Sequence, residues 1–313
     1  MNNIIVFGAN GFIGKNLISE LSKHDNNNII AFDRFSKSKE EDEYYFKNFN
    51  NVTIFRGDFL DKDDVDKALA GIDYVFHSLS MTNPASVSND PFTDIDTNVR
   101  ASIVLFDMCV KNNIEKIVYL SSGGTVYGDI DSIKISEESA TKPKSPYGIG
   151  KLTIENYLRY FKESKGLDYI IYRIANPYGP KQNITSKQGV IPIFINHILK
   201  NEELVVYGDG SMQRDYIYID DVCRMINYSY RSNNRYAEYN IGSGVGTSVS
   251  EILKQIEKIT DIIPKVTYAE TPASFVNASV LDGSRFSNEF GEFKLTELSV
   301  GLKRTLDYVK SKS

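Results

Sequence analysis

The chain has 313 residues, of which 41% are hydrophobic, so it can form one large globular domain or two modest ones. Its net charge of -5 and its lack of a lysine and arginine cluster argue against a nucleic-acid-binding face. These bulk properties favour small-molecule chemistry.

The first predicted element is a strand at residues 4–7, followed by a turn with three glycines and an amphipathic helix. The turn has the sequence Gly8-Ala-Asn-Gly11-Phe-Ile-Gly14. Glycines at these positions let backbone N–H groups at a helix N-terminus approach a pyrophosphate with no side chain in the way. An ordinary surface turn is the alternative, but the order of strand, turn and helix favours a dinucleotide site.

The second predicted strand, residues 29–32, ends at an acidic residue, Asp33, about 20 residues beyond the glycine turn. A carboxylate at this place can accept hydrogen bonds from the ribose hydroxyls of an adenosine, which favours NAD. The neighbouring Arg34 could pair with a 2′-phosphate, so NADP stays open as an alternative. NAD is the cofactor that we predict.

Apolar runs alternate with helix-like stretches through the first half of the chain. This alternation predicts an α/β fold with a Rossmann-like, doubly wound parallel sheet. Ligands of such sheets bind beyond the carboxyl ends of the strands, so the residues that directly follow each run are candidates for chemistry. The later runs are 52–55, 74–76, 117–120 and 169–172, the helix-like stretches include 98–110 and 147–161, and the candidates are Asp58, 78–80, 121–125 and Asn176.

The pattern changes after Ala175, where the segment Asn176-Pro-Tyr-Gly-Pro180 predicts a rigid turn. We expect a smaller, discontinuous C-terminal substrate domain to begin there. The predicted division gives residues 1–175 to an NAD-binding Rossmann domain, with a return at 215–245, and residues 176–214 and 246–313 to the substrate-binding domain.

Tyr147 and Lys151 lie four residues apart at the start of the predicted helix 147–161 and share one face of it. Gly148 and Gly150 occupy the same turn, although each glycine costs a helix roughly 1 kcal/mol, and such broken local rules often mark functional sites. A free tyrosine has a pKa near 10, but a nearby ammonium and a positive nicotinamide ring would stabilise its phenolate. Lowering that pKa by about three units takes roughly 4 kcal/mol. The pair is a candidate catalytic base and its partner; the alternative is an exposed surface pair.

Over nearly its whole length the chain resembles the extended short-chain dehydrogenase/reductase family, and within it the nucleotide-sugar epimerase branch typified by UDP-glucose 4-epimerase. The motifs that carry the resemblance are specific when taken together. Besides the glycine turn they are Gly57-Asp58, Leu120-Ser-Ser-Gly-Gly-Thr-Val-Tyr-Gly128, Tyr147-Gly-Ile-Gly-Lys151, Arg173-Ile-Ala-Asn-Pro-Tyr-Gly-Pro180 and Tyr207-Gly-Asp-Gly-Ser-Met-Gln-Arg-Asp-Tyr216.

The resemblance implies a role for each matching residue. Tyr147 would be the catalytic base with Lys151 as its partner, Asp58 would contact the adenine, Asn176 the sugar nucleotide and Arg214 its diphosphate. Arginine suits a diphosphate because its planar fork meets two oxygens at once. The full predicted cofactor set is Gly8, Gly11, Phe12, Ile13, Gly14, Asp33, Asp58, Phe59, Ser78, Asn98, Ser121, Tyr147 and Lys151, and the substrate set is Ser122, Tyr147, Asn176, Val190, Arg214 and Ser279.

The implied activity is NAD-dependent 4-epimerisation of a nucleotide sugar, a UDP-hexose or a UDP-N-acetylhexosamine, for polysaccharide precursors. Tyr147 would take the proton of the 4-hydroxyl while carbon 4 gives up a hydride, and the resulting 4-keto sugar would turn and regain the hydride on its other face. Two alternatives stay open: a reductase of a nucleotide-linked 4-keto sugar, and a protein that senses NAD without turning anything over.

The chain departs from the family pattern at several positions. The resembling epimerases have a serine or threonine where this chain has Gly123, so Ser122 is the first substitute for that hydroxyl and Thr125 the second. Pro272 and Phe275 stand where the family commonly has an arginine and an aspartate, and this weakens the expected diphosphate anchoring. The small side chain of Ser279 leaves room for an N-acetyl group.

Several further expectations concern partners and location. The family suggests a homodimer formed through the helices around 98–110 and 147–161. The histidines are scattered without ligand spacing, and the two cysteines, Cys109 and Cys223, form no disulfide framework, so no metal is predicted. Because the sequence shows no leader and no membrane-spanning run, we expect a cytoplasmic protein without a membrane partner.

Overall fold

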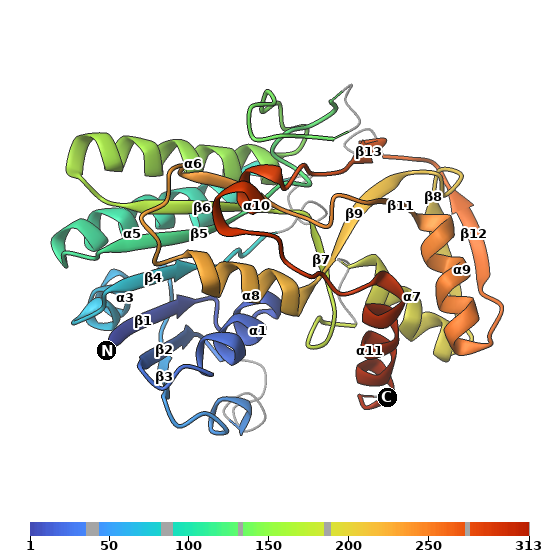
Figure 1. Ribbon diagram of the computed structural model, residues 1–313, viewed down its shortest axis with the longest axis horizontal. Helices are drawn as coiled ribbons and strands as arrows, with labels where there is room; N and C mark the ends of the chain where they lie inside the picture. The colour runs from blue at the N-terminus through green and yellow to red at the C-terminus, as the bar shows by residue number, and fades with distance from the viewer. Residues whose placement is uncertain (36–43, 83–89, 131–133, 185–188, 273–275, 313) are drawn as a thin grey trace. The chain divides into compact units, whose positions relative to one another are not determined.

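The computed structural model describes residues 1–35, 44–82, 90–130, 134–184, 189–272 and 276–312 (Figure 1). The chain divides into two compact units, each built from separate stretches of sequence. The first holds Met1–Ser121, Pro146–Tyr172 and Ile226–Glu238, and the second Ser122–Ser145, Arg173–Met225 and Tyr239–Ser313. This division differs from the expected one in four segments, because 122–145, 173–175, 215–225 and 239–245 belong to the second unit.

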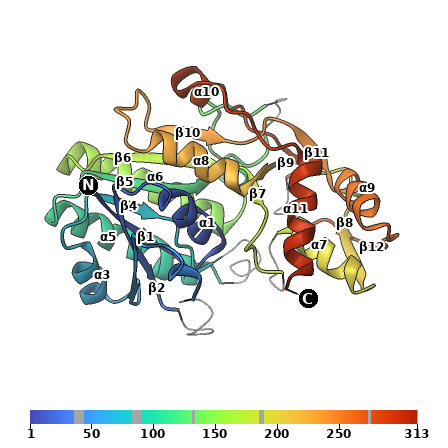
Figure 2. The same ribbon diagram turned by 60° about the horizontal axis from the view of Figure 1, so that its bottom comes forward.

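A seven-stranded sheet has the order β10-β6-β5-β4-β1-β2-β3, as the predicted Rossmann-like, doubly wound fold requires (Figures 1 and 2). The pairs from β3 through β2, β1 and β4 to β5 are all parallel. The strands are β1 Asn2–Phe7, β2 Asn27–Asp33, β3 Val52–Arg56, β4 Tyr74–His77, β5 Lys116–Ser122, β6 Tyr169–Ile174 and β10 Glu238–Ile241. The helices between them are α1 Phe12–Leu21, α3 Lys62–Leu69, α4 Pro91–Asp94, the π-helical segment Ile95–Val99, α5 Arg100–Lys111 and α6 Pro146–Lys165.

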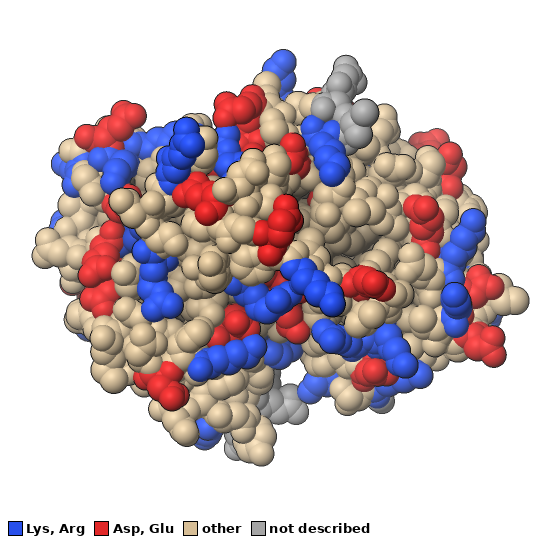
Figure 3. All heavy atoms as spheres, in the orientation of Figure 1, with Lys and Arg blue, Asp and Glu red and all other residues tan. Residues whose placement is uncertain are grey.

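Charged side chains of both signs are interspersed on the face shown in Figure 3. Both cysteines, Cys109 and Cys223, are free thiols that lie buried. Within the described ranges, every helix is too short or too polar to cross a membrane.

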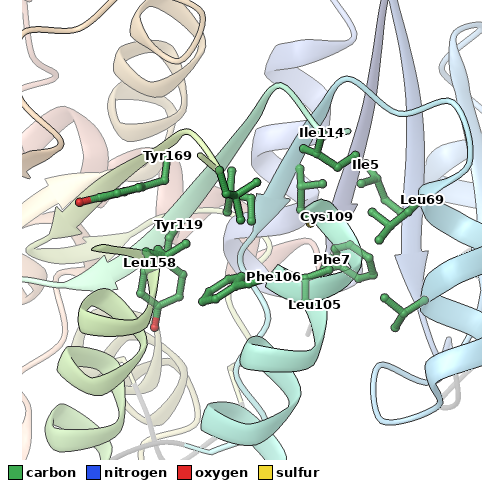
Figure 4. Close-up of a cluster of buried hydrophobic side chains, with 14 of the residues drawn as sticks. Ile5, Phe7, Leu69, Leu105, Phe106, Cys109, Ile114, Tyr119, Leu158 and Tyr169 are labelled. Carbon is green, nitrogen blue, oxygen red and sulfur yellow. The ribbon is translucent and has the colours of Figure 1, made fainter. Parts of the chain in front are cut away.

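Helices α3, α5 and α6 pack on one face of the sheet because the strands alternate their side chains between faces. Figure 4 shows Ile5 and Phe7 of β1 pointing into this core together with Phe106 of α5 and Leu158 of α6. Helix α1 contacts β1 and β2 and buries Leu17, Ile18 and Leu21. Strands β1, β4 and β5 are parallel neighbours, so their carboxyl ends meet at one edge of the sheet. The residues that directly follow each strand lie at this edge.

The second unit is built around β9, Gln213–Tyr218, which pairs with β11, Gly246–Ser248, with β13, Ala278–Ser279, and with β7, Asn176–Tyr178. Its own core joins helices α7, α9 and α11 to strands β8 and β9. The remaining bounds are α7 Val190–Leu199, β8 Glu203–Tyr207, α8 Ile219–Ser229, α9 Val249–Thr260, β12 Lys265–Ala269, α10 Ser284–Phe290 and α11 Leu298–Lys310.

Candidate active site

The glycine turn between β1 and α1 has the shape that a pyrophosphate needs. Gly8 has a φ of 83°, in the left-handed region that favours glycine. A Cβ at Gly14 would lie 2.1 Å from the carbonyl oxygen of Gly8, so no side chain fits there. Helix α1 begins at Phe12, and its N-cap, Gly11, offers no side-chain cap. The first N–H groups of the helix, those of Phe12 and Ile13 among them, thus have no intrahelical partner and are open to an anion.

Asp33 closes β2 and is held against the glycine turn. One of its carboxylate oxygens accepts a hydrogen bond from the Asn10 amide at 3.0 Å, and the other from the Arg34 amide at 2.8 Å. Each oxygen keeps a free lone pair that can accept from a hydroxyl. The turn and this carboxylate together fit the pyrophosphate and ribose of NAD.

The other predicted cofactor residues lie where strands β3 and β4 end. Asp58 accepts a hydrogen bond from the Leu60 amide at 3.0 Å, and its own amide donates to Asp64 at 2.9 Å. Phe59 is buried, with its ring centroid 5.5 Å from that of Phe7. The Ser78 hydroxyl donates to the Phe7 carbonyl at 2.7 Å. Phe59 and Ser78 thus use their side chains within the protein, and the Ser78 amide also donates to the Phe7 carbonyl, at 3.1 Å.

Tyr147 and Lys151 lie in the first turns of α6, on one face, as the sequence predicts. Lys151 is buried, and its Nζ donates to the Leu120 carbonyl at the end of β5, at 3.0 Å. The same nitrogen lies 5.0 Å from the ring centroid of Tyr119 and 5.8 Å from that of Tyr147. One turn later, Glu155 is fully buried and accepts a hydrogen bond from the Ser121 hydroxyl at 2.6 Å.

The acidities of this pair differ from the expected ones. Burial, and next the charge of Asp94, raise the pKa of Tyr147 to about 12, while a hydrogen bond with Ser80 acts to lower it. Burial lowers the pKa of Lys151 to about 8, against the opposing charges of Asp94 and Glu155. The pKa of Tyr147 is therefore raised, and not lowered as expected, because burial and the charge of Asp94 outweigh the groups that lower it.

Asn98 belongs to a buried polar cluster behind the pair. Its amide nitrogen donates to Thr82 at 2.7 Å and to Asp94 at 2.9 Å, and its oxygen accepts from the Met81 amide at 2.9 Å. The side chain is thus committed to organising the segment after β4. A small cavity of about 10 Å³ adjoins the cluster; its lining is Leu79, Ser80, Asp94, Asn98, Tyr147, Gly150, Lys151 and Ile154.

Two buried carboxylates of this region, Asp94 and Glu155, are absent from the predicted site. Glu155 stands four residues after Lys151, the spacing of neighbours on a helix face, so the sequence did carry a signal for it. Asp94 lies far from α6 in the sequence. The sequence signal that relates to Asp94 is Gly150, because a glycine inside a helix often has a packing cause.

In the second unit, β9 brings together three predicted substrate residues. Arg214 stands opposite Ser279 of β13 on one side and Thr247 of β11 on the other. Asn176 of β7 pairs with Tyr216, and its amide donates to the Asp215 carbonyl at 3.2 Å. The proposed contacts of Arg214, Ser279 and Asn176 therefore start from adjacent positions of one small sheet.

The neighbouring residues Arg214 and Asp215 differ in burial and in their hydrogen bonds. The Arg214 side chain is partly buried, and this burial lowers the pKa of its guanidinium. Asp215 is fully buried and accepts hydrogen bonds from the Ser243 amide at 2.7 Å, the Gly244 amide at 3.1 Å and the Leu281 amide at 3.2 Å. Asp215 thus fixes two loops around β9, and Arg214 is the residue suited to an anion.

Gly123 lies close to the Leu281 side chain and to the Arg173 carbonyl. A Cβ at Gly123 would meet a methyl group of Leu281 and lie 3.1 Å from the Arg173 carbonyl, so a serine there requires the Leu281 side chain to move. Of the two substitutes, Ser122 ends β5, and Thr125 has a buried hydroxyl that lacks a hydrogen-bond partner among the described residues.

The remaining predicted positions are less informative. Val190 opens α7 after Gly189, whose φ is 102°, and packs against the core of the second unit. Pro272 is partly buried, and Phe275 lies outside the described residues.

The chain is similar to known proteins over nearly its whole length. A model of the NAD dependent epimerase/dehydratase family matches residues 4–242. A dTDP-4-dehydro-6-deoxyglucose reductase of Escherichia coli is 30% identical, over 99% of this chain and 98% of that protein. A UDP-glucose 4-epimerase structure from Thermotoga maritima, with UDP-glucose, is 32% identical with a TM-score of 0.91 and covers 99% of both chains. A UDP-N-acetylglucosamine 4-epimerase structure from Methanobrevibacter ruminantium M1, with UDP-N-acetylmuramic acid, is 31% identical with a TM-score of 0.89, covering 100% of this chain and 99% of that chain.

Proposed function

Because the chain belongs to the NAD dependent epimerase/dehydratase family and uses NAD, we propose that it is a 4-epimerase of UDP-sugars. Its substrate is a UDP-hexose or a UDP-N-acetylhexosamine, and its product serves polysaccharide synthesis. The observation that carries the proposal is the pair of Tyr147 and Lys151 on one face of α6, with the buried lysine ammonium 5.0 Å from the ring centroid of Tyr119 and 5.8 Å from that of Tyr147. The similarity to two structures named as 4-epimerases supports it.

The proposed reaction gives a task to the cofactor and to Tyr147, Lys151 and Arg214. NAD, when bound, accepts a hydride and later returns it. The phenol oxygen of Tyr147 takes the proton of the sugar 4-hydroxyl and gives it back. Lys151 places a positive charge beside Tyr147, and Arg214 meets the diphosphate with two N–H donors.

The hydroxyl that the family places at position 123 comes from Thr125 in our proposal, with Ser122 second. This reverses the order expected from the sequence. The reason is that a buried hydroxyl without a partner carries a desolvation cost that a substrate oxygen would remove.

A second candidate function is reduction of a nucleotide-linked 4-keto sugar. The observation that favours it is the 30% identity to the Escherichia coli reductase. A reductase releases its oxidised cofactor at each turnover, whereas an epimerase can retain NAD through purification.

The test is proton NMR of the purified protein with UDP-glucose and, separately, with UDP-N-acetylglucosamine, without added cofactor. We expect the anomeric signal of a 4-epimer to grow with one of the two sugars. A Tyr147→Phe variant should lose roughly 10³-fold in rate, while Tyr157→Phe, on the exposed side of α6, should match the parent. Full activity of Tyr147→Phe, or no conversion of either sugar even with added NAD, would contradict the proposal.

A further inference from the structure

Asp94 is a buried carboxylate that forms no ion pair with any residue that the structure describes. It ends α4, just before the π-helical segment Ile95–Val99, and only 3% of it is exposed. Its oxygen Oδ1 accepts hydrogen bonds from the Thr82 hydroxyl at 2.5 Å and from the Asn98 amide at 2.9 Å. Both donors are neutral, and among the residues that the structure describes no cation forms an ion pair with Asp94. A buried charge in this position costs free energy unless a cation lies near it.

The second oxygen of Asp94 lies against the backbone of α6. A Cβ built on Gly150 would lie 1.8 Å from Oδ2, so the carboxylate occupies the space that any side chain at position 150 would take. Gly150 directly precedes Lys151 and follows Tyr147 by three residues. Asp94, Tyr147, Gly150 and Lys151 also line the same small cavity, of about 10 Å³. The glycine inside α6 thus has a physical cause in a residue of another element.

Two carboxylates, Asp94 and Glu155, act on the charge of Lys151, and of the two only Asp94 has no ion pair with another cation among the described residues. Glu155 also acts on Lys151, but it has its own cation, Arg159, whose Nη2 lies 3.4 Å from Oε2, and it accepts a hydrogen bond from Ser121. His77 on β4 is buried, and burial lowers its pKa to about 3, so it is neutral near pH 7. Tyr119 on β5 is buried, and burial raises the pKa of its phenol, which keeps it protonated.

We propose that Asp94 is a positioning residue for the Tyr147–Lys151 pair: its carboxylate, seated on Gly150, keeps Lys151 charged and disfavours the phenolate of Tyr147. The carboxylate thereby favours the state in which both groups carry their protons. That is the state from which Tyr147 returns a proton to the sugar oxygen, so the functional meaning of the assignment rests on the proposed 4-epimerisation.

The test is a titration of Lys151 in the intact protein. The protein is labelled with lysine carrying ¹³C at Cε, and the Lys151 signal is assigned with Lys151→Arg. In the parent we expect a midpoint at about pH 8, the pKa to which burial brings this amine. In Asp94→Asn, which keeps an acceptor for Thr82 and Asn98 but removes the charge, the midpoint should fall by about one pH unit. The matched control is Asp96→Asn, an exposed residue of the same helical run, which should leave the midpoint unchanged.

A second variant keeps the test independent of how Asp94→Asn folds. Gly150→Ala leaves all charges in the chain but displaces the carboxylate, so it should lower the Lys151 midpoint in the same direction. A midpoint that stays within about 0.2 pH units of the parent in Asp94→Asn, or in Gly150→Ala, overturns the proposal. Conversion of UDP-glucose is followed on the same samples. An inactive parent with the shifted titration would count against the proposed function alone, while an active parent with an unshifted titration would count against the role of Asp94 alone.

Discussion

Tyr147 shows how far a side chain's environment can move its acidity from the value that a motif suggests. A motif of tyrosine and lysine leads one to expect a lowered tyrosine pKa, yet burial and the charge of Asp94 raise it to about 12. The protein's own groups therefore hold the proton on Tyr147. An oxidised nicotinamide ring bound next to the phenol would add a positive charge that lowers this pKa.

His77 makes the stability of the protein depend on pH. It is fully buried, and burial lowers its pKa from 6.5 to about 3. Between these values the unfolded chain binds a proton that the folded chain does not, so stability rises with pH and is lost as pH falls below 6.5. We expect a loss of about 2 kcal/mol in the free energy of unfolding between pH 6.5 and 4.5. Urea unfolding at several pH values measures it.

The control for this prediction is a pair of histidine variants. His77→Asn should flatten the loss between pH 6.5 and 4.5, and His197→Asn, at the surface of α7, should leave it in place. An equally steep loss in His77→Asn would show that another group is responsible.

Thr125 offers a prediction in which activity and stability separate. Its hydroxyl has no partner among the described residues, so Thr125→Val removes no hydrogen bond within the protein and should not lower the melting temperature. If the hydroxyl meets the sugar oxygen, kcat should fall by about 10²-fold. Ser122→Ala should have the smaller effect on kcat. The opposite ranking would return Ser122 to first place.

The glycine turn and the position of Asp33 beside it could be predicted because their signals are local. Gly8, Gly11, Gly14 and Asp33 follow one another in the chain order that a strand, a turn and a helix require, and their contact with a cofactor stays a prediction. The partners of Asp94 could not be predicted, because Gly150 and Asp94 are joined only by the packing of α4 against α6. The sequence shows a glycine inside a predicted helix, but it does not show that the Asp94 carboxylate occupies the space beside it.

Helix α6 carries a testable consequence of that packing. In an ordinary helix, glycine to alanine gains about 1 kcal/mol. In Gly150→Ala the new methyl group meets the Asp94 carboxylate, so the variant should instead lose about 1–3 kcal/mol in the free energy of unfolding. In an Asp94→Ala background the same change should be neutral or stabilising. Urea unfolding of the four proteins measures the coupling, and equal effects in both backgrounds would contradict the packing argument.

Strand β9 places Arg214 between Ser279 and Thr247, and this arrangement predicts how a conservative change acts. Arg214→Lys keeps the charge but loses the planar fork that binds two oxygens. Because a diphosphate is bound in ground and transition states alike, KM should rise about tenfold with little change in kcat. Arg235→Lys, at an exposed position, is the control. A drop in kcat with an unchanged KM would place Arg214 at the reacting atoms instead.

At the scale of the whole molecule, the order of strands and helices was predictable from hydrophobic alternation. The division of the chain into two units was less predictable from the sequence. The predicted first domain, 1–175, includes the segment 122–145, which instead contacts distant parts of the chain. Ile135 forms a bridge with Leu281, and the Gly123 amide donates to the Ile174 carbonyl at 2.8 Å. Such contacts have no periodic pattern in the sequence.

Helix α6 leaves apolar side chains at the surface, which bears on assembly. Ile149, Tyr157 and Tyr160 are 53%, 37% and 54% exposed and lie on one face of the helix. We expect this face to form the interface of the predicted homodimer, because burial of these side chains removes apolar area from water. Light scattering after gel filtration should give twice the chain mass of 35.3 kDa for the parent and the chain mass for Ile149→Glu/Tyr160→Glu. A monomeric parent would contradict the expectation.

The central claim is that carbon 4 of a UDP-sugar loses a hydride and regains the same hydride before the cofactor leaves the site. The most direct measurement uses whichever of UDP-glucose and UDP-N-acetylglucosamine is converted, deuterated at carbon 4, with the purified protein in ordinary water and an excess of added unlabelled NADH. We predict a 4-epimer that keeps its deuterium in full, seen by NMR and mass. A 4-epimer that has lost its deuterium, or a labelled sugar that stays unconverted, would contradict the account.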